Sequence, residues 1–248
     1  MEEQLLKSGE RINQLFSTDI KIIQNREVFS YSVDSVLLSR FPRFPKKGLI
    51  VDFCAGNGAV GLFASSRTEA QILSVEIQER LADMAERSVR LNGLEKQMQV
   101  ICDDLKNMPA HIQGSKVDMI LCNPPYFKVA PHSNLNESEH YLLARHEITT
   151  NLEEICRSAQ KILKSNGRFV MVHRPDRLLE ILEMFQQHHL APKRLQFVYP
   201  KREKEANMLL IEAIKDGSIS GFKILPPLII HNDDGTYTPE VQEIYYGS

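Results

Sequence analysis

Four consecutive residues, Asn123-Pro124-Pro125-Tyr126, follow an apolar run of strand type at residues 117–122. The asparagine offers a side-chain carbonyl as an acceptor, and each proline keeps its backbone carbonyl while having no N–H to donate. The tyrosine adds a ring face on which a flat group can stack. The combination predicts a clamp for a planar group that carries an NH2. A proline-rich turn that caps the strand is the simpler alternative, but the flanking asparagine and tyrosine favour the clamp.

Carboxylates stand at the ends of three other expected strands. These acids are Asp52, Glu76 and the pair Asp103 and Asp104. The carboxylate of Glu76 can accept two hydrogen bonds from a ribose diol. The carboxylate of Asp103 or Asp104 can accept a hydrogen bond from an adenine amine. A solvated strand end or a helix cap explains any one of them more simply. Acids at three successive strand ends together favour a nucleoside site.

A glycine turn in residues 52–58 accompanies the first acid. Gly56 and Gly58 let the backbone pass close to a ligand, and ligands of open α/β sheets bind outside the carboxyl ends of the strands. The sequence holds no G-x-x-x-x-G-K-[ST] motif, and the third glycine of G-x-G-x-x-G is missing, although Gly61 follows. The acid at position 52 suits a cationic ligand better than a pyrophosphate. A nucleoside that bears an amino acid and a sulfonium therefore fits better than a dinucleotide.

Alternating strand and helix patterns position these groups. Strands are expected at residues 48–53, 71–76, 97–102, 117–122 and 168–173, with a closing pair at 195–199 and 206–214. Helices are expected from about residue 59 and at residues 78–91, 152–163 and 177–188, with stops at Asn92-Gly93 and Asn166-Gly167. Such alternation predicts an α/β fold with a mostly parallel sheet covered on both faces.

Two stretches interrupt the alternation. Residues 1–47 mix helical and hairpin patterns and are expected to form an extension packed on the core, with the main domain at residues 48–248. Residues 127–147 form a long polar insert directly after the tetrapeptide, on the side where a substrate would bind. Loops of this length are usually functional or disordered.

The bulk composition limits the classes of protein. A chain of 248 residues with 42% hydrophobic residues suffices for one large domain. The net charge of -2 means that any nucleic-acid contact must come from a local patch. No apolar run is long enough for a membrane span, and no signal-peptide pattern opens the chain. The four scattered cysteines are expected to be buried thiols. We expect a cytoplasmic monomer.

The acids, the glycine turn and the tetrapeptide, in this order and spacing, resemble class I S-adenosylmethionine-dependent methyltransferases that act on planar amino nitrogens. Further segments make the chain similar to the bacterial valine-tRNA adenine N6-methyltransferase family. These segments are residues 22–25, 34–38, 75–78, 92–94, 144–147 and 172–175. The similarity extends from about residue 10 to residue 240.

This resemblance implies a Rossmann-like domain with a seven-stranded sheet and an antiparallel edge strand. It implies transfer of a methyl group from S-adenosylmethionine to adenine N6 next to the anticodon of a tRNA, without a metal and with S-adenosylhomocysteine as product. Asn123, Pro124, Pro125 and Tyr126 would be the catalytic residues. The cofactor residues would be Asp52, Phe53, Cys54, Ala55, Gly56, Gly58, Glu76, Ile77, Asp103, Asp104, Leu105 and Asn123. RNA contacts would come from Arg145, His146, Arg174, Lys201 and Arg202.

Other activities stay open at this point. Methylation of a glutamine amide in a translation release factor uses the same tetrapeptide, but such enzymes carry a larger N-terminal recognition domain. Methylation of another nucleic-acid amino group, such as adenine in DNA, is a third possibility. An RNA-binding module without turnover is a fourth, and the intact tetrapeptide and acids disfavour it.

Overall fold

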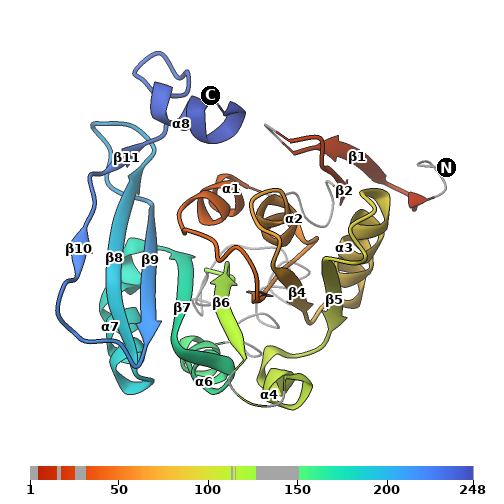
Figure 1. Ribbon diagram of the computed structural model, residues 1–248. Coiled ribbons are helices and arrows are strands. Elements are labelled where there is room, and N and C mark those ends of the chain that lie inside the picture. The colour runs from red at the N-terminus through yellow and green to blue at the C-terminus, as the bar shows by residue number, and fades with distance from the viewer. Residues whose placement is uncertain are drawn as a thin grey trace, which may run out of the picture.

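The computed structural model describes residues 5–15, 18–25, 32–112, 114, 116–126 and 151–247. A twisted central sheet forms the middle of the molecule, with helices on both faces (Figure 1). Its seven longer strands are β3 (Leu49–Phe53), β4 (Gln71–Glu76), β5 (Met98–Cys102), β6 (Val117–Cys122), β7 (Leu163–His173), β8 (Leu190–Tyr199) and β9 (Met208–Lys215). Two short strands, β10 (Lys223–Ile224) and β11 (Leu228–Ile229), pair with β8.

The strand order is β10-β8-β9-β7-β6-β3-β4-β5. β9 runs antiparallel to both of its neighbours, β7 and β8, and the other pairs of this sheet are parallel. β3 and β6 are buried over nearly their whole length, as strands covered on both faces must be. The predicted fold class, a mostly parallel sheet with helices on both faces, is confirmed.

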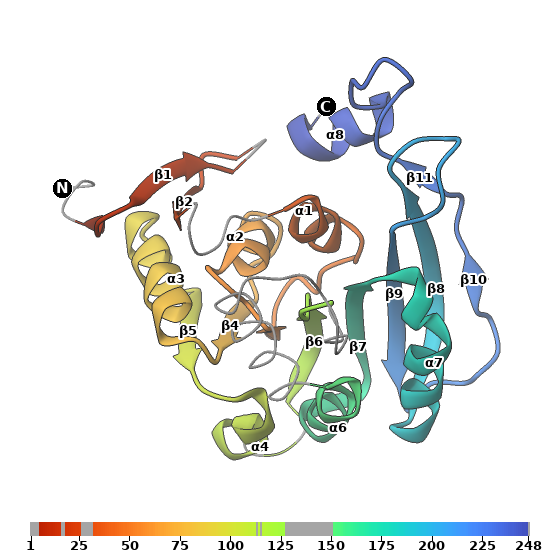
Figure 2. The same ribbon diagram turned by 180° about the vertical axis from the view of Figure 1, so that it is seen from behind.

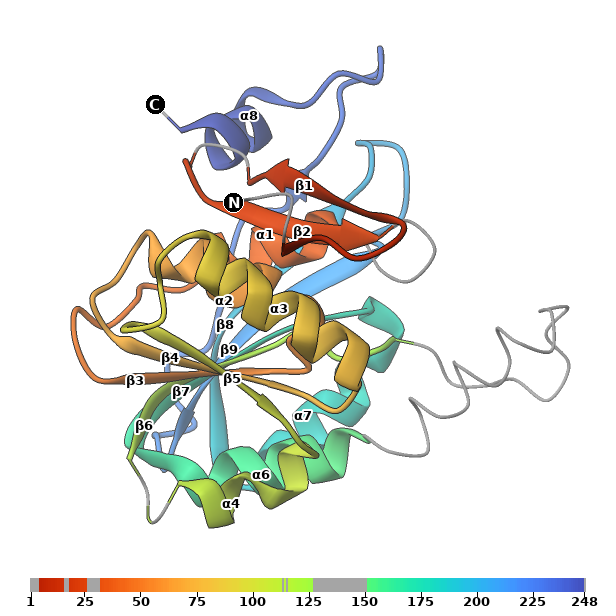
Figure 3. The same ribbon diagram turned by 90° about the vertical axis from the view of Figure 1, so that its right-hand side faces the viewer.

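Helices cover the two faces of the sheet in separate layers (Figure 3). One layer holds α1 (Val33–Arg40), α2 (Ala59–Ser65) and α3 (Glu79–Leu91). The other holds α4 (Met108–His111), α6 (Leu152–Ile162) and α7 (Leu178–Gln187), with single 3-10 turns η2 (Leu105–Asn107) and η3 (Pro175–Arg177) beside them. A separate apolar cluster fills the space under each layer. The middle strands of the sheet are therefore shielded from water on both sides.

Helix ends follow the local sequence signals in two cases. α3 ends at the expected Asn92-Gly93 pair, where Gly93 has a φ of +64°, a conformation that glycine adopts without strain. α6 begins with a capping box in which the Asn151 side chain accepts from the Glu154 N–H at 2.9 Å. Both signals are local in sequence, so they favour these helix ends independently of tertiary contacts.

The second expected stop, Asn166-Gly167, lies inside a strand instead. α6 ends at Ile162 and β7 begins at once at Leu163. The pairing of β6 with β7 shifts between Val117 and Met119, opposite this segment. A Cβ on Gly167 would lie 2.8 Å from the Lys164 carbonyl oxygen, so glycine permits a close backbone approach here. The Asn-Gly pair thus marks a strand irregularity and not a helix end.

Two outer elements cover the α1–α3 layer. An antiparallel hairpin of β1 (Glu10–Gln14) and β2 (Lys21–Asn25) packs on α3, and α8 (Pro239–Tyr246) packs on α1 (Figure 2). The division of the chain into an extension of residues 1–47 packed on the core and a main domain of residues 48–248 stays a prediction. Each helix of the described residues is too short or too polar to cross a lipid bilayer.

Candidate active site

Two loops leave the sheet side by side at the point where the strand order reverses. From β3 the chain proceeds outward through β4 and β5, and it then returns to place β6 on the other side of β3. Phe53 of β3 pairs with Cys122 of β6, so the glycine turn and Asn123 begin at adjacent strand ends. A ligand of an open α/β sheet binds at such a switch point.

The glycine turn after β3 adopts a left-handed backbone at several positions. Cys54, Gly56 and Gly58 have φ values of 57°, 56° and 84°. A Cβ on Gly58 would stand 3.0 Å from the Cβ of Ala85, because the turn passes close to α3. The Asn57 Nδ2 donates to the Ile23 carbonyl of β2 at 3.1 Å, which connects the turn to the N-terminal hairpin. The turn is therefore held in place by α3 and by the N-terminal hairpin.

Asp52 lies beneath this turn and is completely buried. Its Oδ2 accepts from the Gly61 N–H at 3.1 Å, in the first turn of α2, and from the Ser74 hydroxyl at 3.5 Å. Burial raises the pKa of Asp52 to about 7. Its Oδ1 is buried without a hydrogen-bond partner among the described residues. The structure shows the Asp52 side chain in contact with α2 and β4, and a direct contact with a cationic ligand stays a prediction.

Glu76 ends β4 beside the turn. Its Oε2 accepts from the Gly56 N–H at 2.8 Å and its Oε1 from the Gln78 N–H at 2.9 Å. Each carboxylate oxygen has a second lone pair, so both can also accept from a hydroxyl. Next to it, Ile77 is 39% exposed and offers an apolar surface at the same sheet edge. These groups fit a ribose diol and a flat purine.

Asp103 and Asp104 follow β5 and have different partners. Asp103 accepts from Asn107 Nδ2 at 2.8 Å and lies 2.7 Å from His111 Nε2; the hydrogen bond from His111 is the main cause that lowers the pKa of Asp103. Asp104 caps the following turn by accepting from the Lys106 N–H at 3.0 Å. Either acid keeps acceptor capacity for an amine, so the choice between them stays open.

The remaining expected cofactor residues support the loops through packing. Phe53, Ala55 and Leu105 are at least nine-tenths buried, Phe53 and Leu105 in the apolar cluster under α4, α6 and α7, and Cys54 is partly exposed. The side chains of the three buried residues hold the backbone of the strand ends in place. Their contact with a cofactor could come only through backbone groups.

The tetrapeptide after β6 faces the N-terminal end of α1. The Tyr126 hydroxyl lies 2.7 Å from Asp34 Oδ2 and 2.6 Å from Asn123 Oδ1. The Asn123 Nδ2 lies 3.4 Å from the Ser35 hydroxyl oxygen. The Tyr126 ring also lies against His173, with ring centroids 5.4 Å apart. The clamp predicted from four residues therefore includes groups from two further elements.

His173, at the end of β7, is buried and neutral. Its Nδ1 accepts from the Arg174 N–H at 2.8 Å, so the proton of the ring is on Nε2. Burial lowers the pKa of His173 to about 4. Asp34, Ser35 and His173 received no individual role from sequence alone, although they stand in the segments 34–38 and 172–175 that carry the family resemblance.

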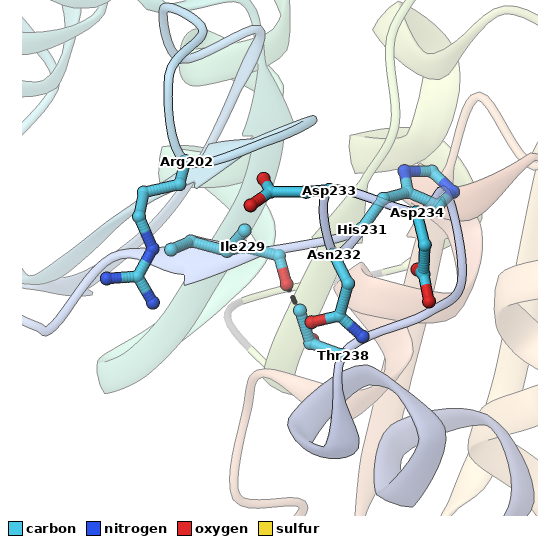
Figure 4. Close-up of a pocket in the computed structure, with 7 residues that line it drawn as sticks. All are labelled: Arg202, Ile229, His231, Asn232, Asp233, Asp234 and Thr238. Carbon is cyan, nitrogen blue, oxygen red and sulfur yellow. Dashed lines mark hydrogen bonds between the residues drawn. The ribbon is translucent and has the colours of Figure 1, made fainter.

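Of the expected RNA contacts, Lys201 and Arg202 lie beside the segment 229–238, and Arg174 lies at the start of η3. Arg174 is about half exposed beside Asp176, and Lys201 donates to the Asp233 carbonyl at 3.0 Å. Arg202 lines a surface pocket of about 390 Å³ with residues of the segment 229–238 (Figure 4). No residue that lines this pocket belongs to the ends of β3–β6. Arg145 and His146 lie outside the described residues.

The polar groups around the switch point fit the expected cofactor, S-adenosylmethionine. Glu76 and the acids after β5 supply acceptors, and Asn57 Oδ1 in the glycine turn is buried without a partner in the described part of the chain. No cluster of three metal-ligating side chains occurs among the described residues. Cofactor contacts of individual residues stay predictions.

Residues 19–199 match the family described as the methyltransferase small domain. Curated relatives include a tRNA1(Val) (adenine(37)-N6)-methyltransferase of Porphyromonas gingivalis, 27% identical over 84% of this chain and 83% of the relative. A protein of the same name from a Shewanella species (strain MR-4) is 26% identical over 86% of this chain and 89% of the relative.

Solved structures show the same fold. A predicted O-methyltransferase from Agrobacterium tumefaciens has a TM-score of 0.69 and 23% identity, covering 87% of this chain and 96% of its own. Geranyl diphosphate C-methyltransferase from Streptomyces coelicolor A3(2), in complex with S-adenosyl-L-homocysteine, has a TM-score of 0.55 and 14% identity, covering 72% of this chain and 76% of its own.

Proposed function

The chain belongs to the methyltransferase small domain family, and we propose that it methylates the exocyclic N6 of an adenine in tRNA, next to the anticodon of a valine tRNA. S-adenosylmethionine is the methyl donor in this proposal. The names of the Porphyromonas and Shewanella relatives support the substrate. The order of the site residues supports the chemistry.

One observation carries the proposal. The tetrapeptide that begins at Asn123 and the glycine turn that follows Phe53 leave adjacent parallel strands at the switch point of the sheet. An acceptor pair for an amine therefore stands beside a nucleoside site with Glu76 at its edge. A methyltransferase needs these two sites next to each other, because donor and acceptor must meet within about 3–3.5 Å.

Glu76 would accept from the ribose diol, and Asp103 or Asp104 from the adenine amine of the cofactor. When bound, S-adenosylmethionine supplies an electrophilic methyl group on a sulfonium. The glycine turn lets the backbone approach this ligand, and Asp52 holds the first turn of α2, which follows the glycine turn, through the Gly61 N–H. These residues bind and orient, and none of them has to transfer a proton.

The substrate side depends on hydrogen-bond acceptors. The N6 lone pair of adenine is delocalised into the ring, so the nitrogen is a poor nucleophile. The Asn123 side-chain oxygen and the Pro124 carbonyl would accept both N–H bonds and favour the positive charge that develops on nitrogen. Groups of this kind contribute roughly 3–4 kcal/mol each in comparable sites. Tyr126 would stack on the base, for about 1–3 kcal/mol.

The experiment measures tritiated methyl transfer to total tRNA, total protein and DNA from cells that lack the gene. Wild-type protein should label tRNA, and mass mapping should place the label on an adenine beside the anticodon. Asn123→Ala should lower the single-turnover rate at least 100-fold, on the order of the loss of one such acceptor. Its affinity for the cofactor should stay within about threefold of wild type.

Gln187→Ala is the matched control, because Gln187 is an exposed carboxamide on α7 that contacts Glu183. This variant should keep full activity. Label in protein would indicate the release-factor alternative, and label in DNA would indicate a DNA adenine substrate. Near-normal turnover of Asn123→Ala would contradict the assigned role of the clamp.

A further inference from the structure

We propose that Asp34 of α1 is a positioning residue that orients the Asn123 carboxamide through the Tyr126 hydroxyl. This inference rests on the proposed function and deepens it, because it names the group that determines which end of the amide meets the substrate amine. It requires no direct contact between Asp34 and the substrate.

The Tyr126 hydroxyl has one proton and two neighbouring acceptors. Two acceptor oxygens, Asp34 Oδ2 at 2.7 Å and Asn123 Oδ1 at 2.6 Å, lie within hydrogen-bond distance of a hydroxyl that has one proton. The carboxylate is the stronger acceptor, because a hydrogen bond to a charged oxygen is roughly twice as strong as one to a neutral oxygen. The proton is therefore directed to Asp34.

The direction of the Tyr126 proton determines the orientation of the Asn123 carboxamide. With the proton directed to Asp34, the Tyr126 oxygen presents lone pairs to the amide, and two oxygens at 2.6 Å would repel each other. The amide group of an asparagine can be exchanged end for end with little change in shape. With Nδ2 toward Tyr126 the contact becomes a hydrogen bond, and Oδ1 then lies on the side of Ser35, at the longer separation of 3.4 Å.

This orientation leaves the amide oxygen available. Its neighbour, the Ser35 hydroxyl, makes a long and therefore weak contact, so the oxygen can accept from an incoming N–H. The amide nitrogen, which would repel that N–H, is held by Tyr126. The same network thus fixes the orientation of the amide and keeps its acceptor free.

The hydrogen-bond network of Asp34, Tyr126 and Asn123 is stable in the folded protein. Burial, and secondarily the Asp34 carboxylate, raise the pKa of Tyr126 well above its usual range, so the phenol keeps its proton at neutral pH. α1 is anchored by Val36, Leu37 and Leu38, each no more than 1% exposed. Asp34 is therefore presented to Tyr126 by a rigid element.

The test is a double-mutant cycle of Asp34→Ala and Tyr126→Phe, measured as single-turnover rates on tRNA and as cofactor affinity by calorimetry. Each single variant should lower the rate by about 10-fold to 100-fold, as small misplacements of reacting groups do. Cofactor affinity and the KM for tRNA should stay within about twofold. In the Tyr126→Phe background, Asp34→Ala should cost less than about threefold more, because the hydroxyl through which it acts is gone.

Asp19→Ala, at an exposed aspartate in the turn between β1 and β2, is the control and should keep the wild-type rate. Asp34→Asn keeps an acceptor of similar shape and should recover part of the rate lost in Asp34→Ala; it also serves as the test variant if Asp34→Ala fails to fold. The inference would be overturned if Asp34→Ala lowered the single-turnover rate by the same factor in wild type and in Tyr126→Phe. A wild-type rate in Asp34→Ala would also overturn it. A wild-type protein that leaves tRNA unlabelled would instead overturn the proposed function.

Discussion

At the scale of single residues, Asp52 is an acid without access to water. It is completely buried, and burial raises its pKa from 3.8 to about 7. The folded protein therefore keeps this proton to higher pH than the unfolded chain does. The contribution to stability is fully present at low pH and is lost as pH rises through the interval from 3.8 to about 7.

Asp52→Asn removes this ionisation while keeping an acceptor for the Gly61 N–H. We expect the free energy of unfolding of wild type, relative to the variant, to fall by about 2 kcal/mol between pH 5 and pH 7. Urea denaturation at several pH values measures this difference. His173 acts in the opposite direction, since its lowered pKa of about 4 causes stability to be lost as pH falls below 6.5. A difference that does not change with pH would contradict the assignment to Asp52.

The loss of Glu76 should weaken cofactor binding. Glu76→Ala removes charge-assisted acceptors, each worth about 1.5–3 kcal/mol, so the Kd for S-adenosylhomocysteine should rise by about 10-fold to 100-fold. Calorimetry measures it directly. Glu79→Ala, three positions later in the first turn of α3, is the control and should change the Kd less than about twofold. An unchanged Kd in Glu76→Ala would contradict its ribose role.

At the scale of elements, the strands that hold the site could be predicted from sequence because each is a short apolar run bounded by polar turns. β4 and β6 have the expected limits, and β3 and β5 each begin one residue later than expected. β8 begins at Leu190, earlier than the expected residue 195. The polar residues Lys193 and Arg194 interrupt the apolar pattern, so the sequence does not indicate the first part of this strand. Pairing with β9 decides the structure there, and no local pattern reports it.

The contacts that complete the site could not be predicted in the same way. Asp34 and Tyr126 are 92 positions apart, and Asn57 and Ile23 are 34 apart. Both contacts depend on how α1 and the hairpin pack on the sheet layer, which periodicity does not determine. The family resemblance includes residues 22–25 and 34–38 but does not indicate which residues they contact.

The hairpin is fastened to α3 by a buried ion pair, and this pair yields a prediction for the element. Arg87 donates to both carboxylate oxygens of Glu10, at 2.6 and 2.8 Å, and the two side chains are 6% and 2% exposed. Hydrogen bonding to Arg87 is the main cause that lowers the pKa of Glu10. Removing one partner of such a pair leaves a buried charge, which costs about 3–5 kcal/mol.

We therefore expect Arg87→Met to lower the free energy of unfolding by about 3 kcal/mol in urea denaturation. Arg90→Met is the matched control, because Arg90 is 48% exposed and its Glu86 contact is 3.6 Å long, so the change should stay below about 0.5 kcal/mol. Since Asn57 of the glycine turn donates to Ile23 of β2, Arg87→Met should also weaken cofactor binding. Equal losses in both variants would contradict the role of the buried pair.

At the scale of the whole molecule, charge limits how RNA can be held. A net charge of -2 gives no overall attraction to a polyanion, so any affinity for RNA must come from local cations, for which Arg174 and Arg202 are our candidates. Neutralising phosphates releases counterions, and each contact contributes about -0.7 to -0.9 to the slope of log affinity against log salt. Wild-type protein should therefore show a clear negative slope with valine tRNA, measured by filter binding at several salt concentrations.

Arg202→Ala should reduce the size of this slope by about 0.7–0.9, because one phosphate contact is lost. The pocket around Arg202 also contains Asp233 and Asp234, whose charges would repel a phosphate. We therefore attribute the change in slope to Arg202 and not to the pocket as a phosphate site. Lys96→Ala, at an exposed lysine before β5, should leave the slope unchanged. A slope near zero in wild type would contradict RNA binding through phosphates. An unchanged slope in Arg202→Ala would show that Arg202 makes no phosphate contact and that other cations of the chain do.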